Sequence, residues 1–167
     1  MKRLAIPLAA LALATPVLAD GHMAPLATAA VEGDGISGTV TLMTTASGTV
    51  HAVIDVTGVP EGVHGIHLHE TGDCSAADFT SAGGHIAGDR QHGLVEGGPH
   101  PGDMPNATVG ADGALKVEAF LPHLDGETMI LDADGAAFII HEGADDYASQ
   151  PAGDAGSRIA CGVFEAG

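Results

Sequence analysis

The sequence predicts an all-β fold, an antiparallel β-sandwich or barrel of about seven or eight short strands. Short segments alternate polar and apolar residues with a period of two, and no segment shows a convincing helical period. Glycine contributes 25 of the 167 residues, which favours many turns over long helices. Aromatic residues make up only 3% of the chain and Trp is absent, so Val, Ile, Leu and Ala must build the core.

The strand pattern begins at Ala27, after an irregular lead-in. The turn TTASG separates two strands and predicts a hairpin, and the turn GVPEG precedes the next strand. The predicted strands are GTVTLM (38–43), TVHAVIDV (49–56), VHGIHLHE (63–70), ATVG (107–110), GALKVEAF (113–120), AAFIIHE (136–142) and SRIACGVF (157–164). The sequence shows no internal repeat, so residues 20–167 are predicted to form one domain.

The first 19 residues have the pattern of a secretory signal peptide. Lys2 and Arg3 precede a mostly apolar run that ends in VLA, with small residues before the expected cleavage site after Ala19. The alternative is a buried N-terminal helix. We expect cleavage and export to the periplasm.

Two long segments show neither the period of a strand nor that of a helix. Residues 71–105 contain eight glycines, three prolines and three histidines, and residues 143–156 form a second glycine-rich loop. Loops of this length are uncommon in a compact domain unless they carry function or are disordered.

The mature chain is strongly acidic. Without the leader it carries three cationic side chains and 22 carboxylates, a formal charge of −19. Nucleic acid and anionic membranes are therefore excluded as partners, because binding either of them requires a basic surface.

The two cysteines, Cys74 and Cys161, are predicted to form a disulfide, because an even count in an exported protein favours pairing. The alternative is two unpaired, buried thiols.

Seven residues have the types and spacing of metal ligands. His67 and His69 are two positions apart on a predicted strand, so their side chains share a face about 6.6 Å apart along the strand. This pair alone also fits two polar side chains on a solvated face. Further candidates follow in the loop and at the end of a later strand: His85, His92, His100, Asp103 and His141. A glycine-rich loop loses much conformational entropy when it is ordered, and metal coordination can offset that loss.

The remaining histidines are predicted not to bind metal. His51 is interpreted as a surface residue of a strand, and His64 as a hydrogen-bonded structural histidine out of phase with His67. The others in this class are His22 and His123.

Five ordered motifs, GIHLHETGDC, FTSAGGH, HPGDMPN, IIHEGADD and GSRIACGVF, resemble the copper–zinc superoxide dismutases of the exported bacterial type. The resemblance runs from about Ala27 to the C-terminus. It implies a flattened eight-stranded Greek-key barrel, with two long loops that carry the metal site.

The resemblance also implies a role for each site residue. Copper is assigned to His67, His69, His85 and His141, and zinc to His85, His92, His100 and Asp103, with His85 bridging the ions. Asp145 is implied to link His67 to His92, Arg158 to bind the anion beside copper, and Cys74 to pair with Cys161. The chain would then convert two superoxide anions to oxygen and hydrogen peroxide, with His85 carrying a proton and zinc structural.

The ligand chemistry agrees with that assignment. Three imidazoles and a carboxylate suit a closed tetrahedral zinc site, and four imidazoles suit a redox-active copper. Two alternatives stay open, a periplasmic copper-binding or copper-delivery protein with the same fold, and a domain that binds zinc alone. The sequence leaves open whether the chain is a monomer or a homodimer.

The chain departs from the family pattern in two places. After the bridging His85 the chain continues as IAGDRQH, where the family has an aromatic residue and NP, and the interval to the next zinc ligand is one residue short. The second loop lacks a lysine, so Arg90 and Arg158 are expected to attract the substrate only locally.

Overall fold

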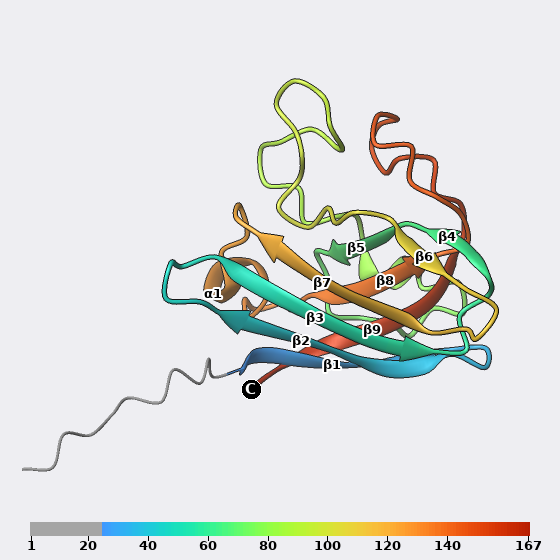
Figure 1. Cartoon of the computed structure of the whole chain (residues 1–167). Helices are drawn as coiled ribbons and strands as arrows, with labels where there is room; N and C mark the ends of the chain where they lie inside the picture. Colours follow the sequence, from blue (N-terminus) through green and yellow to red (C-terminus); the bar gives the residue numbers. More distant parts are fainter. Residues whose placement is uncertain (1–24) are drawn as a thin grey trace, which may run out of the picture.

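The computed structural model describes residues 25–167, which form a curled antiparallel sheet with two long loops above it (Figure 1). The predicted signal peptide lies outside the described residues. The strands are β1 (Pro25–Gly33), β2 (Ser37–Thr44), β3 (Val50–Thr57), β4 (Gly62–His64), β5 (Ile66–His69), β6 (Ala107–Val109), β7 (Leu115–Leu121), β8 (Ala137–His141) and β9 (Arg158–Ala166). The helical elements are a 3-10 turn, η1 (Thr80–Ala82), and one short helix, α1 (Gly126–Met129).

Seven strands make one sheet in the order β5-β8-β9-β1-β2-β3-β7, and β4 pairs with β6 in a second sheet. All of these pairings are antiparallel. The all-β prediction is confirmed. None of the helical segments within residues 25–167 has the length and apolar character needed to cross a bilayer.

The predicted strand 63–70 is divided between the two sheets, which gives nine strands rather than eight. Gly65 interrupts it, because its N–H donates to the Gly143 carbonyl at 2.8 Å and its carbonyl accepts from the His141 N–H at 2.9 Å. Residues before Gly65 pair with β6, and residues after it pair with β8. This division brings the start of the second loop against β5.

The core lies inside the curled sheet and consists of aliphatic side chains with Phe138 at its centre. Leu42, Ile54, Leu68 and Phe138 are at most 1% exposed. Leu68 thus faces the core between His67 and His69, as the period of two predicts.

The interpretation of His51 as a surface residue is wrong. Its exposed fraction is 9%, because the ring of Phe120 lies 5.1 Å away and Glu118 covers its edge at 3.0 Å. These two partners stand on β7, the neighbouring strand of the sheet.

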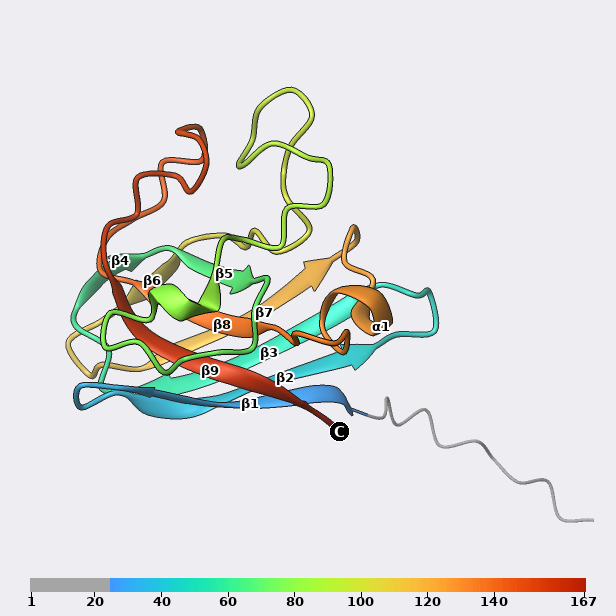
Figure 2. The ribbon, with the colours of Figure 1, turned by 180° about the vertical axis from the view of Figure 1, so that it is seen from behind.

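The two loops rise on the same side of the sheet, as both views show (Figure 1, Figure 2). We call residues 70–106, between β5 and β6, the first loop, and residues 142–157, between β8 and β9, the second loop. Both begin directly after strands that carry candidate ligands.

Candidate metal centre

Four histidines converge where β5 and β8 meet the first loop. His67 and His69 come from β5, His141 ends β8, and His85 reaches β5 through an isolated bridge to His69. One ring nitrogen of each lies within 4.8 Å of the others. We call this set the copper group.

Each member of the copper group directs an unpaired nitrogen at its neighbours. These atoms are His67 Nδ1, His69 Nε2, His85 Nε2 and His141 Nε2, and they are the buried side-chain atoms without a hydrogen-bond partner in residues 25–167. Burying a polar atom without a partner costs free energy, so native proteins rarely leave four together. Four convergent imidazole lone pairs fit a copper ion.

The other nitrogens of His69 and His141 fix the orientation of their rings. His69 Nδ1 donates to the Gly83 carbonyl at 3.0 Å, and His141 Nδ1 donates to the Gly156 carbonyl at 3.2 Å. Since a neutral imidazole has one N–H, each ring must present a lone pair at Nε2. A hydrogen bond behind a ligand is the usual way in which a protein sets its tautomer.

Three histidines of the first loop surround Asp103. The Nδ1 atoms of His85, His92 and His100 lie 3.0, 3.1 and 3.2 Å from its Oδ1. Four ligands about 2.05 Å from a tetrahedral zinc would be about 3.3 Å apart, so these separations match a zinc site. Asp103 Oδ2 accepts from the Gly93 N–H at 2.9 Å and the His100 N–H at 3.0 Å, which fixes the carboxylate. We call this set the zinc group.

His85 belongs to both groups. Its Nδ1 faces Asp103 in the zinc group, while its unpaired Nε2 faces the copper group. The shortened segment HIAGDRQH does not prevent this, because the Ile86 N–H donates to the Leu68 carbonyl at 2.8 Å and holds the loop against β5.

Asp145 joins the two groups from behind. Its Oδ2 accepts from His67 Nε2 at 2.8 Å and its Oδ1 accepts from His92 Nε2 at 3.0 Å. Asn106 fixes the backbone of Asp145, since its amide accepts from the Asp145 N–H and donates to the Asp145 carbonyl, both at 2.8 Å. The carboxylate that the resemblance implies between His67 and His92 is therefore in place.

Burial keeps three histidines of the site neutral. Burial lowers the pKa of His67 to about 3, of His69 to about 2 and of His141 to about 4. Burial alone would raise the pKa of Asp145, but hydrogen bonds from His67, His92 and the Tyr147 N–H outweigh it and lower that pKa to about 2. Neutral imidazoles with an ionised carboxylate behind them are the protonation states that metal binding requires.

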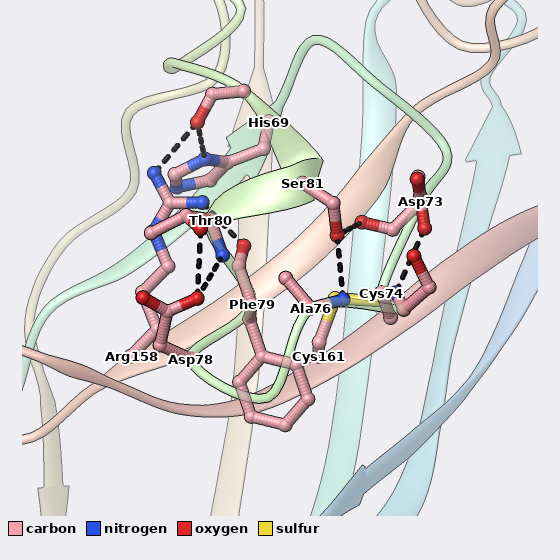
Figure 3. Close-up of a disulfide and its surroundings, with 12 residues drawn as sticks. His69, Asp73, Cys74, Ala76, Asp78, Phe79, Thr80, Ser81, Arg158 and Cys161 are labelled. Atoms are coloured by element: carbon pink, nitrogen blue, oxygen red, sulfur yellow. Dashed lines mark hydrogen bonds between the residues drawn. A yellow bond between two sulfur atoms is a disulfide. The ribbon is translucent and has the colours of Figure 1, made fainter.

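Arg158 begins β9, where its backbone pairs with His141, and its side chain lies near His69 of the copper group (Figure 3). Its Nη1 donates to the Phe79 carbonyl and its Nη2 to the Gly83 carbonyl, both at 2.6 Å. Gly83 thus accepts from both Arg158 and His69. The guanidinium is held in one position and keeps further N–H donors for an anion.

The predicted disulfide between Cys74 and Cys161 is confirmed. It joins the first loop to β9, three residues from Arg158, with the two Cα atoms 5.9 Å apart. Phe79 packs beside it in a small cluster with Ala82 and Ile139, and Figure 3 shows Phe79 next to the disulfide. The disulfide therefore holds the carbonyl groups that bind Arg158 against the strand that carries it.

His64 has the structural role that the sequence predicts. Its Nδ1 lies 2.8 Å from the His141 carbonyl and its Nε2 lies 2.9 Å from the Pro60 carbonyl.

Arg90, expected to act as a local cation, directs its Nε to the Pro99 carbonyl and its Nη2 to the Gly98 carbonyl at 2.6 Å. Arg90 thus binds the backbone of the first loop.

Gly153 packs directly against the contact between Asp145 and His92. A Cβ atom at this position would lie 2.5 Å from Asp145 Cγ and 2.6 Å from His92 Nε2, and would overlap Asp145 Oδ1. The residue also has a φ of +68°, which glycine adopts at little cost. This position accommodates glycine alone.

Comparison with known proteins identifies the family. The family model described as copper/zinc superoxide dismutase (SODC) matches residues 36–164. The chain belongs to the copper/zinc superoxide dismutase family.

Members of this family from several bacteria are similar over most of the chain. The copper–zinc superoxide dismutase of Caulobacter vibrioides is 39% identical over 148 residues, covering 83% of this chain and 85% of that protein. The enzyme of Deinococcus radiodurans is 34% identical over 179 residues, covering 96% and 95%. The crystal structure of a SOD-like protein from Bacillus subtilis has a TM-score of 0.76 at 35% identity, covering 81% of this chain and 96% of that one.

Three hydrogen-bonding residues of the site are not predicted by the sequence motifs. Asn106 clamps Asp145, Gln150 contacts the backbone of His92, and the hydroxyl of Tyr147 accepts from the Asn106 N–H at 2.7 Å. Asn106 stands in the motif HPGDMPN, but an amide that binds backbone has no characteristic spacing. These contacts join two loops far apart in sequence and emerge only from the folded chain.

Proposed function

We propose that this chain is a superoxide dismutase with one copper and one zinc ion. Copper is held by His67, His69, His85 and His141, and zinc by His85, His92, His100 and Asp103. The observation that carries the proposal is the set of four unpaired, buried nitrogens beside a set of three imidazole nitrogens and one carboxylate oxygen. Two further facts support the same assignment: His85 belongs to both groups, and the chain belongs to the family.

The balanced reaction takes two superoxide anions and two protons to one oxygen and one hydrogen peroxide. Bound copper supplies a centre that accepts and returns one electron. Arg158 binds the incoming anion with the N–H groups that the Phe79 and Gly83 carbonyls leave free. His85 Nε2, which lacks a protein partner, would hold a proton for the product only while it is not bound to copper.

The remaining residues keep the site in place during turnover. Asp145 orients His67 and His92 without entering the copper group, and the carbonyls of Gly83 and Gly156 orient His69 and His141. A zinc ion with no open position has a structural role, because no ligand site is left for substrate.

Location and assembly belong to the same proposal. A leader at residues 1–19 followed by a single domain at residues 20–167 supports a periplasmic protein, and the disulfide supports an oxidising compartment. Superoxide is the small-molecule substrate. Neither a monomer nor a homodimer is favoured by the residues of the site.

The test combines metal analysis with a superoxide assay on the mature chain. We expect one copper, one zinc and dismutation in the wild type. His69→Ala should lose copper and activity and keep zinc, and His100→Ala should lose zinc, because each removes a ligand of one group. His123→Ala is the matched control, since His123 lies outside both groups.

Two results would contradict the proposal. Full copper and zinc content without dismutation would select a copper-binding or copper-delivery protein. Zinc in both groups after loading with both ions would select a zinc-binding domain.

A further inference from the structure

The side-chain amide of Gln150, in the second loop, forms hydrogen bonds with the backbone of His92, in the first loop. Gln150 Oε1 accepts from the His92 N–H at 2.9 Å, and Gln150 Nε2 donates to the His92 carbonyl at 2.9 Å. The two residues are 58 positions apart in sequence. The contact therefore links the two loops at one residue of the zinc group.

This double contact fixes the conformation of a single residue. The N–H of His92 belongs to the peptide group before its Cα, and its carbonyl belongs to the peptide group after it. An amide bound to both fixes the two peptide planes, and with them the direction in which the side chain leaves the backbone. The imidazole of His92 is thereby aimed without any contact between Gln150 and the ring.

The ring itself is held from the same loop. Asp145 accepts from His92 Nε2 at 3.0 Å, which leaves His92 Nδ1 to face Asp103 at 3.1 Å. The second loop thus holds His92 at three atoms, two in the backbone through Gln150 and one in the ring through Asp145. His92 itself is fully buried.

The surrounding backbone needs such a contact. Gly93 follows His92 with a φ of +78°, and residues 71–105 contain eight glycines. Each glycine has more conformational freedom to lose than other residues, so ordering this loop is costly. The backbone of Gln150 is not part of the zinc group, and its side chain makes one further contact, to the Ala148 carbonyl at 3.1 Å.

We propose that Gln150 is a positioning residue for His92, which prepares the zinc group for its ion from the opposite loop. This inference rests on the proposed zinc site. Part of the ordering cost of the first loop is then met before zinc arrives, so the ion binds more tightly than it would to a free loop.

The test is zinc affinity, measured on the full mature chain by competition with a chelator. Gln150→Met keeps the length of the side chain and removes both hydrogen bonds to His92. We expect its zinc dissociation constant to rise about tenfold, as when other groups that orient a ligand are removed. The matched control is Gln91→Met, the same change at an exposed neighbour of His92, and we expect it to stay within about twofold of the wild type.

Three further measurements separate positioning of His92 from a general loss of stability. Because Gln150 is exposed, its replacement leaves no cavity, and we expect the metal-free melting temperature to be unchanged. Copper affinity should also be unchanged, because His69 and His141 are oriented by other carbonyls. Cobalt bound in place of zinc should show an altered visible spectrum in Gln150→Met alone.

The outcomes distinguish this inference from the proposed function. Tight zinc binding by the wild type and equally tight binding by Gln150→Met would overturn the role of Gln150 and leave the zinc site standing. An equal fall in copper affinity, zinc affinity and melting temperature would also overturn it. A wild type that binds no zinc would overturn the inference together with the zinc site.

Discussion

Each histidine of the copper group uses its two ring nitrogens differently. One nitrogen is unpaired and faces the other rings, and the second is engaged by a carbonyl, by Asp145 or, for His85, by the zinc group. This division explains how four imidazoles can pack together with their unpaired nitrogens facing one another. Their tautomers are determined by the protein before any ion is considered.

Arg158 is the residue whose removal should affect substrate without affecting metal. Arg158→Ala is expected to lower kcat/KM roughly tenfold or more, because a local positive charge raises the rate at which an anion arrives. Lys116→Ala removes the same charge from an exposed pair with Asp55 and should change little. Steady-state kinetics and metal content are measured together, and loss of copper from Arg158→Ala would contradict the role.

Some residues of the site can be predicted from the sequence and others cannot. His67, His69 and Asp103 were predicted because strand period and tight spacing place ligand atoms together, and the structure brings them together. The sequence predicts no role for Gln150 and a wrong one for His51, because the role of each depends on a partner from another segment. Local spacing carries no information about such partners.

At the scale of elements, the disulfide is a covalent link between the first loop and the sheet. Its cysteines are 87 positions apart, so opening it frees a long stretch of the unfolded chain. The variant with both Cys74→Ser and Cys161→Ser is expected to lose about 4–5 kcal/mol of unfolding free energy.

Chemical denaturation of the metal-free proteins measures this difference. The double variant should also release the Phe79 carbonyl from Arg158 and so lower kcat/KM. Equal midpoints with and without the disulfide would show that the loop is ordered by its other contacts alone.

Most strands follow directly from the period-two pattern, because each has one face in the core. The break at Gly65 does not, since HGIH continues the pattern while its backbone partners change from β6 to the second loop. A hydrogen-bond partner supplied by a distant loop leaves no trace in hydropathy. The element types could be predicted, but not the point where one strand becomes two.

For the whole molecule, acid should destabilise the metal-free state well above the usual range for carboxylates. Burial lowers the pKa of His67 to about 3 and that of His141 to about 4, whereas both titrate near 6.5 when unfolded. Between pH 6.5 and 4 the unfolded chain therefore binds more protons, and stability falls as the pH falls.

Each such group contributes about 1.4 kcal/mol per pH unit, which corresponds to roughly 4 °C in melting temperature. Calorimetry of the metal-free protein from pH 7.5 to 4.5 measures the effect. Below pH 4 the lowered pKa of Asp145 continues the same trend. A melting temperature that stays constant over this range would show that the histidines are not held neutral.

The charge of the whole molecule predicts a second property. The chain has a formal charge of −17, or −19 without the predicted leader, which repels an anionic substrate at long range, and Arg158 acts over a short distance only. Salt screens long-range repulsion, so kcat/KM should stay level or rise slightly between about 10 and 200 mM ionic strength. A steep fall with added salt would instead indicate attraction by a local field.

Gly153 has a consequence for how this molecule can vary over evolution. It contributes no functional group, yet the carboxylate of Asp145 and the ring of His92 occupy the space where any side chain would begin. Any side chain at this position should therefore displace Asp145 or His92. The metal centre therefore restricts the choice of amino acid at Gly153 as well as at the ligands, because Asp145 and His92 need the space that a side chain would fill.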